Sequence, residues 1–247
     1  METTRRWPLL LAGLTGFLLC LALFPPVGWL GERLAKATGD RLTLSGTQGT
    51  LWDGDTQLVL FDGTDHRAIP GRLAWRIRPL AWFDSGEALL SLQHPALDQP
   101  LAVSKKPEGL VVSGGQLNFP AAWLEATGTP WNTLKPGGTI RLAWGNITAG
   151  QSFAVNLRWQ DAQSALSVVK PLGNYEVLAN IGPDGSMTAR LGTLSGDLQL
   201  EGQASWSAPQ GFGFSGYASA SPSQQVALTG LLSQMGRLEN NRYRLGS

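Results

Sequence analysis

The chain has 247 residues, which is enough for a membrane anchor followed by one sizeable β domain or two small ones. Only 15% of the residues are Asp, Glu, Lys or Arg, well below the typical ~25%, and the formal net charge is +1. This balance excludes a strong basic field for nucleic acid. The abundance of glycine (31) and tryptophan (10) favours a β protein with tight turns and is not typical of a disordered chain.

The N-terminal 30 residues predict a transmembrane anchor. Arg5 and Arg6 precede an uncharged stretch at 7–30, and roughly 20 apolar residues are enough to cross a bilayer. We expect residues 1–6 in the bacterial cytoplasm, residues 7–30 in the inner membrane and the rest in the periplasm, because positive flanks stay on the cytoplasmic side. The alternative is a cleaved signal peptide, which also starts basic and has an apolar core. Either interpretation exports the rest of the chain.

Residues 31–40 predict a short linker, with a helix at 32–38 that ends at Gly39. From residue 41 to residue 247, apolar and polar residues alternate in short runs separated by turn residues such as Asp53-Gly54 and Gly114-Gly115. Such runs are typical of antiparallel strands. The expected strands are 41–45, 56–61, 71–77, 88–92, 139–144, 153–159, 165–169, 175–180, 187–191, 198–202, 204–206, 212–218 and 242–245. The sequence therefore predicts a mainly β periplasmic domain at 41–247: a strongly twisted antiparallel β-sheet or sandwich, or an open groove, with one or two short helices.

Two short helices are expected within this domain. The first covers 120–127, with a proline near its start and a glycine just past its end, and we expect it to form a lid on the sheet edge. The second begins with Ser221-Pro222-Ser223-Gln224, which fits a capping box, and ends at Gly236. Its apolar face is expected to pack on the domain's own sheet, and a partner-helix site is the alternative. That face consists of Leu228, Leu231, Leu232 and Met235.

The densest basic stretch is broken by apolar residues with a period of two. This alternation predicts the solvent-facing side of a strand, and contact with anionic lipid headgroups is the alternative. The basic residues are Arg72, Arg76 and Arg78.

Residues that carry chemistry are scarce in this sequence. His66 and His94 are the only histidines, neither has a partner at metal-ligand spacing, and both are expected at the surface. The single cysteine, Cys20, rules out an intrachain disulfide and a cysteine-based metal site. We therefore expect no catalytic, cofactor-binding or metal-binding residue, no cofactor and no small-molecule substrate. Paired carboxylates for sugar hydrolysis meet only in a fold, so a periplasmic hydrolase stays as a third alternative.

Three segments, in order, resemble one known family. The segment Gly46-Thr47-Gln48-Gly49-Thr50-Leu51-Trp52-Asp53-Gly54 resembles the Gly-Thr-Leu-Trp-(Asp/Asn)-Gly signature of type II secretion system protein N, also called general secretion pathway protein N. The segment 171–175 resembles the next recurring element of that family. Residues 231–237 and 241–245 resemble its C-terminal helix and strand. Within the signature we expect a buried Trp52 and a positive φ at Gly54.

The resemblance implies an accessory inner-membrane component that assists the export of folded proteins, with other inner-membrane proteins of the type II secretion system and membrane lipid as partners. A distant likeness to long β-groove proteins that carry lipid between membranes implies an alternative, a lipid-binding or lipid-transfer groove. The tryptophans could fill a sandwich core or line such a groove. They are Trp52, Trp75, Trp82, Trp123, Trp131, Trp144, Trp159 and Trp206.

Overall fold

The computed structural model describes residues 28–61, 65–83, 88–129 and 131–246. The expected anchor at 7–30 therefore lies almost entirely outside the described residues. Within the described ranges no helix is long and apolar enough to cross a membrane. The expected linker helix is present as α2 (Gly28–Thr38), which begins earlier than predicted and ends just before Gly39, a residue with a φ of +60°.

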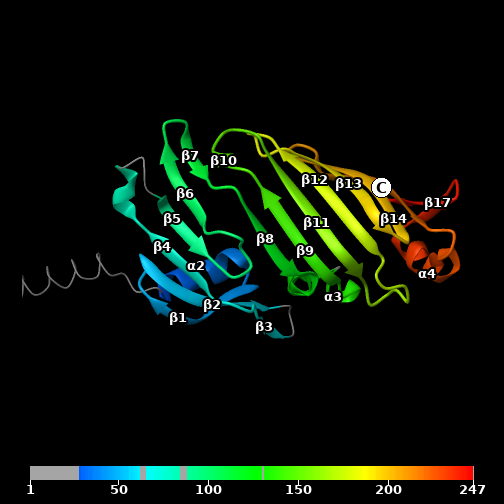
Figure 1. The fold of residues 1–247 in the computed structure, drawn as a ribbon, viewed down its shortest axis with the longest axis horizontal. Coiled ribbons are helices and arrows are strands. Elements are labelled where there is room, and N and C mark those ends of the chain that lie inside the picture. The colour runs from blue at the N-terminus through cyan, green and yellow to red at the C-terminus, as the bar shows by residue number, and fades with distance from the viewer. Residues whose placement is uncertain (1–27, 62–64, 84–87, 130, 247) are drawn as a thin grey trace, which may run out of the picture.

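Two antiparallel sheets make up the body of the described chain and lie one after the other along its long axis (Figure 1). The first sheet contains β1 (Leu42–Gly49), β2 (Asp53–Phe61), β3 (His66–Ala68), β4 (Leu73–Ile77), β5 (Ala88–Gln93), β6 (Leu101–Lys106), β7 (Gly109–Val112) and β10 (Ile147–Thr148). The second contains β8 (Gly115–Pro120), β9 (Gly137–Trp144), β11 (Phe153–Gln163), β12 (Gly173–Ile181), β13 (Met187–Gly196), β14 (Leu198–Ser207), β15 (Gly211–Ala220), β16 (Arg237–Glu239) and β17 (Arg242–Leu245). The mainly β prediction is thus confirmed.

One bent hairpin belongs to both sheets and joins them. Val112 of β7 faces Ile147 of β10, and three residues further along each strand Gly115 of β8 faces Trp144 of β9. The register therefore continues from one sheet into the other. At the bend, a Cβ on Gly114 would lie 3.1 Å from the carbonyl oxygen of Trp144, which is tighter than an ordinary contact, so glycine favours the close approach of the two backbones.

A second connection crosses the same boundary. The segment between β5 and β6 lies along the free edge of β8: the N–H of Asp98 donates to the carbonyl of Gln116, and the N–H of Asn118 donates to the carbonyl of Ala96. The Asp98 carboxylate also accepts the N–H of Gln116 at 2.8 Å. These bonds cover part of an edge that would otherwise leave backbone groups unpaired.

The two helices expected within the β domain are present near their predicted positions, but their helix type and their capping differ from the predictions. The expected helix at 120–127 is a 3-10 helix, η3 (Ala121–Thr127), which contacts both β9 and β2. The second expected helix is α4 (Gln225–Met235), and the predicted capping box is wrong because the Ser221 hydroxyl donates to Asp197 instead. Two further helical turns were not predicted. They are η2 (Pro79–Trp82) and α3 (Trp131–Leu134).

One expected strand is wrong and several were missed. Residues 165–169 alternate like a strand, yet the hydroxyls of Ser164 and Ser167 accept the N–H groups of Leu166 and Val169, and such local bonds replace a strand ladder. The missed strands are β3, β6, β7, β8, β10 and β16. Three of them, β7, β8 and β10, form part of the bent hairpin, and β6 pairs with β7. Gly114-Gly115 lies at the bend of this ribbon rather than in the expected turn.

Candidate functional site

The second sheet has one apolar and one polar face, which the cross-strand register defines. Leu157 of β11 pairs with Leu142 of β9 on one side and with Val177 of β12 on the other. Val177 in turn pairs with Leu191 of β13. We call the side that carries these residues the apolar face. Its central members are Leu142, Val155, Leu157, Val177, Ala179 and Leu191.

One end of the apolar face is closed by α4. Leu228 and Leu232 of this helix are almost completely inaccessible, and they form a cluster with Leu198 and Ala218 of the sheet. The prediction that the apolar face of this helix packs on the domain's own sheet is therefore confirmed. This end is an ordinary dry core.

The other end of the apolar face is covered by aromatic residues from η3 and α3. Trp123 stacks on Phe119, with ring centroids 5.6 Å apart. Trp131 meets Trp159 edge-on at 6.5 Å, and Trp159 lies 6.2 Å from Tyr175. Part of the tryptophan set thus covers or lines the apolar face; the side chain of Trp82 lies outside the described part of the chain.

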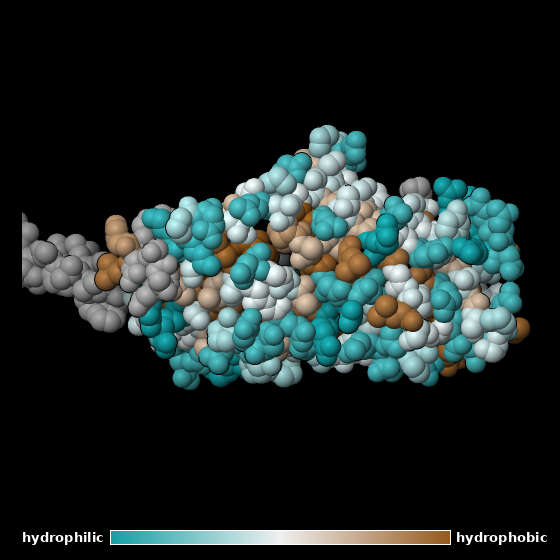
Figure 2. Space-filling model, turned by 45° about the horizontal axis from the view of Figure 1, so that its top comes forward, coloured by the Kyte–Doolittle hydropathy of each residue, from teal (hydrophilic) through white to brown (hydrophobic). Residues whose placement is uncertain are grey.

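The middle of the apolar face stays partly exposed. Its central members are neither fully buried nor fully exposed, in contrast to the cluster beneath α4. At the tip of the β14–β15 hairpin, Trp206 and Phe212 of the same face are 40% and 67% exposed. In Figure 2 apolar residues gather along a hollow between hydrophilic margins. The fold therefore offers an open apolar surface rather than a fully closed sandwich.

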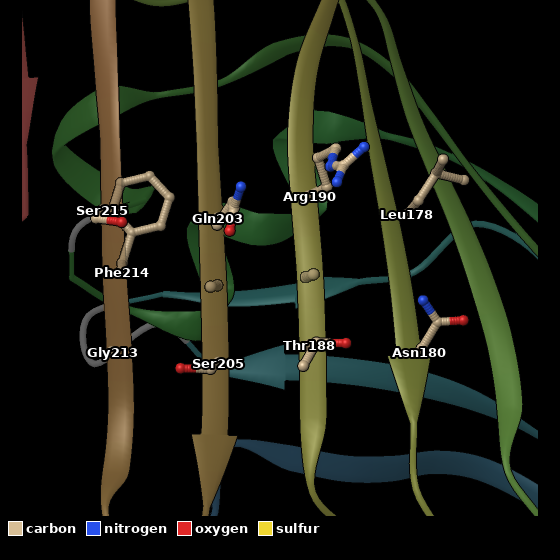
Figure 3. Close-up of a pocket in the computed structure, with 11 residues that line it drawn as sticks. Leu178, Asn180, Thr188, Arg190, Gln203, Ser205, Gly213, Phe214 and Ser215 are labelled. Atoms are coloured by element: carbon tan, nitrogen blue, oxygen red, sulfur yellow. The ribbon is translucent and has the colours of Figure 1, made fainter.

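The opposite, polar face carries two neighbouring hollows that share Arg190, Gln203 and Ser215. The larger has a volume of about 660 Å³ and is lined by side chains such as Asn180, Gln203 and Ser215 (Figure 3). The second, of about 570 Å³, adds Glu201 and Arg244 to the lining, among others. These side chains suit polar contacts with solvent or a partner.

The signature segment builds the turn between β1 and β2. The Thr50 hydroxyl accepts the N–H groups of Trp52 and Asp53, and the indole N–H of Trp75 donates to the carbonyl of Leu51 at 3.0 Å. Trp75 is 5% exposed, whereas Trp52 is only partly buried, so the expected burial of Trp52 is wrong. The buried tryptophan of this region comes from the neighbouring strand.

The glycine requirement in this turn also differs from the prediction. Gly49, not Gly54, has a positive φ, of +89°, and a Cβ there would lie 2.4 Å from the carbonyl oxygen of Asp53. Gly54 must be glycine for a different reason, since its Cβ would lie 2.7 Å from the Trp75 ring. The signature glycines therefore permit close backbone and ring packing.

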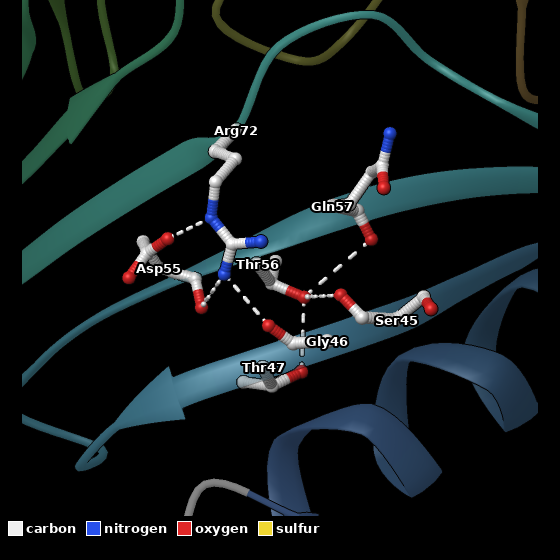
Figure 4. Close-up of polar contacts among 7 residues, drawn as sticks. All are labelled: Ser45, Gly46, Thr47, Asp55, Thr56, Gln57 and Arg72. Carbon is white, nitrogen blue, oxygen red and sulfur yellow. Dashed lines mark hydrogen bonds and ion pairs between the residues drawn. The ribbon is translucent and has the colours of Figure 1, made fainter.

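All three arginines of the basic stretch are exposed, as predicted, but only Arg76 lies within β4, with Arg72 just before it and Arg78 just after it. Arg72 pairs with Asp55 and donates to the carbonyl of Gly46 at 2.6 Å, next to the buried Thr56 (Figure 4). Arg76 pairs with Asp53 at 2.7 Å. Arg72 thus links β1 to β2, whereas Arg76 links β4 to β2.

The two histidines occupy different environments. His66 is exposed as predicted and stacks on Phe61. His94 is buried, so its predicted surface position is wrong. Its Nδ1 accepts the N–H of Ala96 at 3.0 Å, and its Nε2 has no hydrogen-bond partner among the residues that the structure describes. Burial lowers the pKa of His94 below its usual value.

Within the described residues, no group of three His, Cys, Asp or Glu side chains could hold a metal ion.

The two sheets and their faces define a mainly β domain that presents extended surfaces. The family model for the type II secretion system (T2SS), protein N, matches residues 40–246, and the chain belongs to this family. No curated protein and no solved structure matches the chain.

Membership gives the coarse function. Members of this family are components of the secretion machinery, and the family is not a known enzyme family. It indicates a role in type II secretion, a place in the cell envelope and association with other components of the secretion system. The resemblance in the three sequence segments is thereby confirmed.

Proposed function

We propose that this chain is an accessory inner-membrane component of the type II secretion system. Residues 7–30 anchor it, and residues 41–247 form a periplasmic β domain that assists the export of folded proteins across the outer membrane. The observation that carries the proposal is the extent of the family match, which begins at residue 40 and covers the whole β domain. The basic start and apolar stretch of the sequence support the anchor.

The open middle of the apolar face supports a binding role within this function. Covering apolar surface contributes about 25 cal/mol per Å² removed from water, so a partner seated there would gain stability that the free domain lacks. We propose that the partner is another inner-membrane protein of the secretion system.

The test uses two adjacent residues on opposite faces of β12. Ala179 belongs to the apolar face and Asn180 to the polar face. In a strain deleted for this gene, exported enzymes should accumulate in the periplasm. The Asn180→Asp chain should restore export and the Ala179→Asp chain should not, provided that both accumulate to the same level. Unchanged export in the deleted strain would contradict the proposed function, and restoration by both variants would contradict the use of the apolar face.

The second candidate is a lipid-binding or lipid-transfer β-groove anchored in the inner membrane. The observation that favours it is the run of partly exposed apolar residues across β9, β11, β12 and β13, which suits acyl chains as well as protein side chains. A photo-crosslinking amino acid at Val177, with one at Asn180 as control, separates the two. Adducts with a secretion-system protein support the first candidate, and adducts with lipid support the second.

A further inference from the structure

The connection between β4 and β5 exposes two large apolar side chains. Leu80 lies in η2 and Phe83 directly follows it, and they are 80% and 87% exposed. Isolated apolar residues on a surface are common. Two large ones on a single turn form a small projecting patch, which we call the apolar tip.

The turn that carries the apolar tip is itself well anchored. Ala81, between the two exposed residues, is 3% exposed. The N–H of Ala81 donates to the carbonyl of Arg78, and the N–H of Phe83 donates to the carbonyl of Leu80, each at 3.0 Å. η2 also contacts β5. The fold therefore holds Leu80 and Phe83 outward while a small residue fills the interior.

The position of the apolar tip relates it to the membrane. In Figure 1, η2 is the teal turn at the left end of the long axis, where α2 also begins, while α4 lies at the opposite end. α2 begins at Gly28, directly after the uncharged stretch that we assign to the anchor. The tip and the exit of the anchor thus share one end of the domain.

We propose that the apolar tip inserts into the interface of the bilayer that holds the anchor, so that the domain touches the membrane at a second point. This inference rests on the proposed anchoring of residues 7–30. Amphipathic segments bind bilayer interfaces by burying apolar side chains at the boundary of headgroups and acyl chains. Arg72 and Arg76 are engaged by Asp55 and Asp53, so the contact depends on apolar burial, and a zwitterionic bilayer should support it.

The experiment places an environment-sensitive fluorophore on the tip of the full-length chain. Cys20 is first replaced (Cys20→Ala), and Phe83→Cys or Val226→Cys is labelled with a nitrobenzoxadiazole dye. Val226 is the matched control because it is 92% exposed and lies on α4 at the far end. Both positions are exposed, so neither label should disturb the fold. The chains are reconstituted into phosphatidylcholine vesicles with or without nitroxide-labelled lipid.

We expect the emission of the dye at position 83 to be blue-shifted and to be quenched by nitroxide lipid. The dye at position 226 should show neither effect. Equal, water-like emission at both positions would overturn the inference. A blue shift at position 83 without quenching would also overturn it, because it would indicate that the tip contacts protein instead of lipid. Flotation and alkaline extraction of the same vesicles separate the two proposals. A chain that does not stay with the bilayer contradicts the anchor, whereas an anchored chain with a water-exposed tip contradicts only the membrane contact.

Discussion

The apolar face of the second sheet has a closed end beneath α4 and an open middle, and the two regions are built from the same kind of strand. Leu198 at the closed end and Leu191 in the middle both belong to this face, yet only Leu198 is fully buried. The difference arises from α4, which covers one region and not the other. Strand patterning therefore supplies an apolar surface, and helix placement decides whether that surface becomes core or stays open.

The largest effect should come from removing a side chain at the closed end. Leu228 is 0% exposed, so Leu228→Ala should lower the free energy of unfolding by about 2–5 kcal/mol, because it leaves a cavity as well as losing burial. Val177→Ala in the open middle should cost about 1 kcal/mol or less, since a partly exposed side chain loses little. Denaturant unfolding of the full chain measures both. Equal losses would mean that the middle is as tightly packed as the closed end.

A smaller effect is expected at the signature turn of the first sheet. Gly49→Ala combines a left-handed backbone, which costs roughly 1–2 kcal/mol for an L-residue, with a Cβ 2.4 Å from the carbonyl oxygen of Asp53. Gly211→Ala is the matched control, because its φ is +73° and no atom lies within 4 Å of its added Cβ. Thermal unfolding should show the larger loss for Gly49→Ala. If the two losses were equal, φ alone would explain the signature glycine.

Acid should weaken the junction between the two sheets through His94. Burial lowers the pKa of this side chain in the folded protein. The unfolded state therefore binds the proton more readily, and stability present above the ordinary pKa of about 6.5 is lost as the pH falls below that value. Protonation also removes the Nδ1 lone pair that accepts the N–H of Ala96. Ala96 lies in the segment that pairs with β8.

The pH dependence can be assigned with two histidine variants. His94→Asn keeps an acceptor near the N–H of Ala96 and removes the titration, so unfolding midpoints at pH 7.5 and pH 5.5 should move closer together than in the parent chain. His66→Asn, at an exposed position, should leave the parent difference in place. The assignment to His94 fails if His66→Asn and His94→Asn change the midpoints alike.

The sequence predicts the faces of individual strands better than their arrangement. Alternation at 153–159 identifies the apolar members of β11, and the spacing at 228–235 identifies the buried side of α4, because both are local periodicities. Whether the apolar face is covered depends on where η3, α3 and α4 pack, which no local pattern encodes. The same limit explains His94: its neighbours include Trp123, which is distant in sequence.

The smallest effect is expected at the boundary between the closed and open regions. Tyr175 is 3% exposed, and its hydroxyl donates to the carbonyl of Leu198 at 2.9 Å. Burial and the nearby Asp197 carboxylate raise the pKa of the Tyr175 phenol well above its usual range, which keeps this donor protonated. Tyr175→Phe removes the hydrogen bond and retains the ring, so it should cost about 1 kcal/mol. Because the bond ties β12 to the start of β14 at the rim of the α4 cluster, its loss should also speed amide exchange of Leu198 and leave that of Val177 unchanged. Exchange that rises equally at both residues would show that the two regions open as one unit.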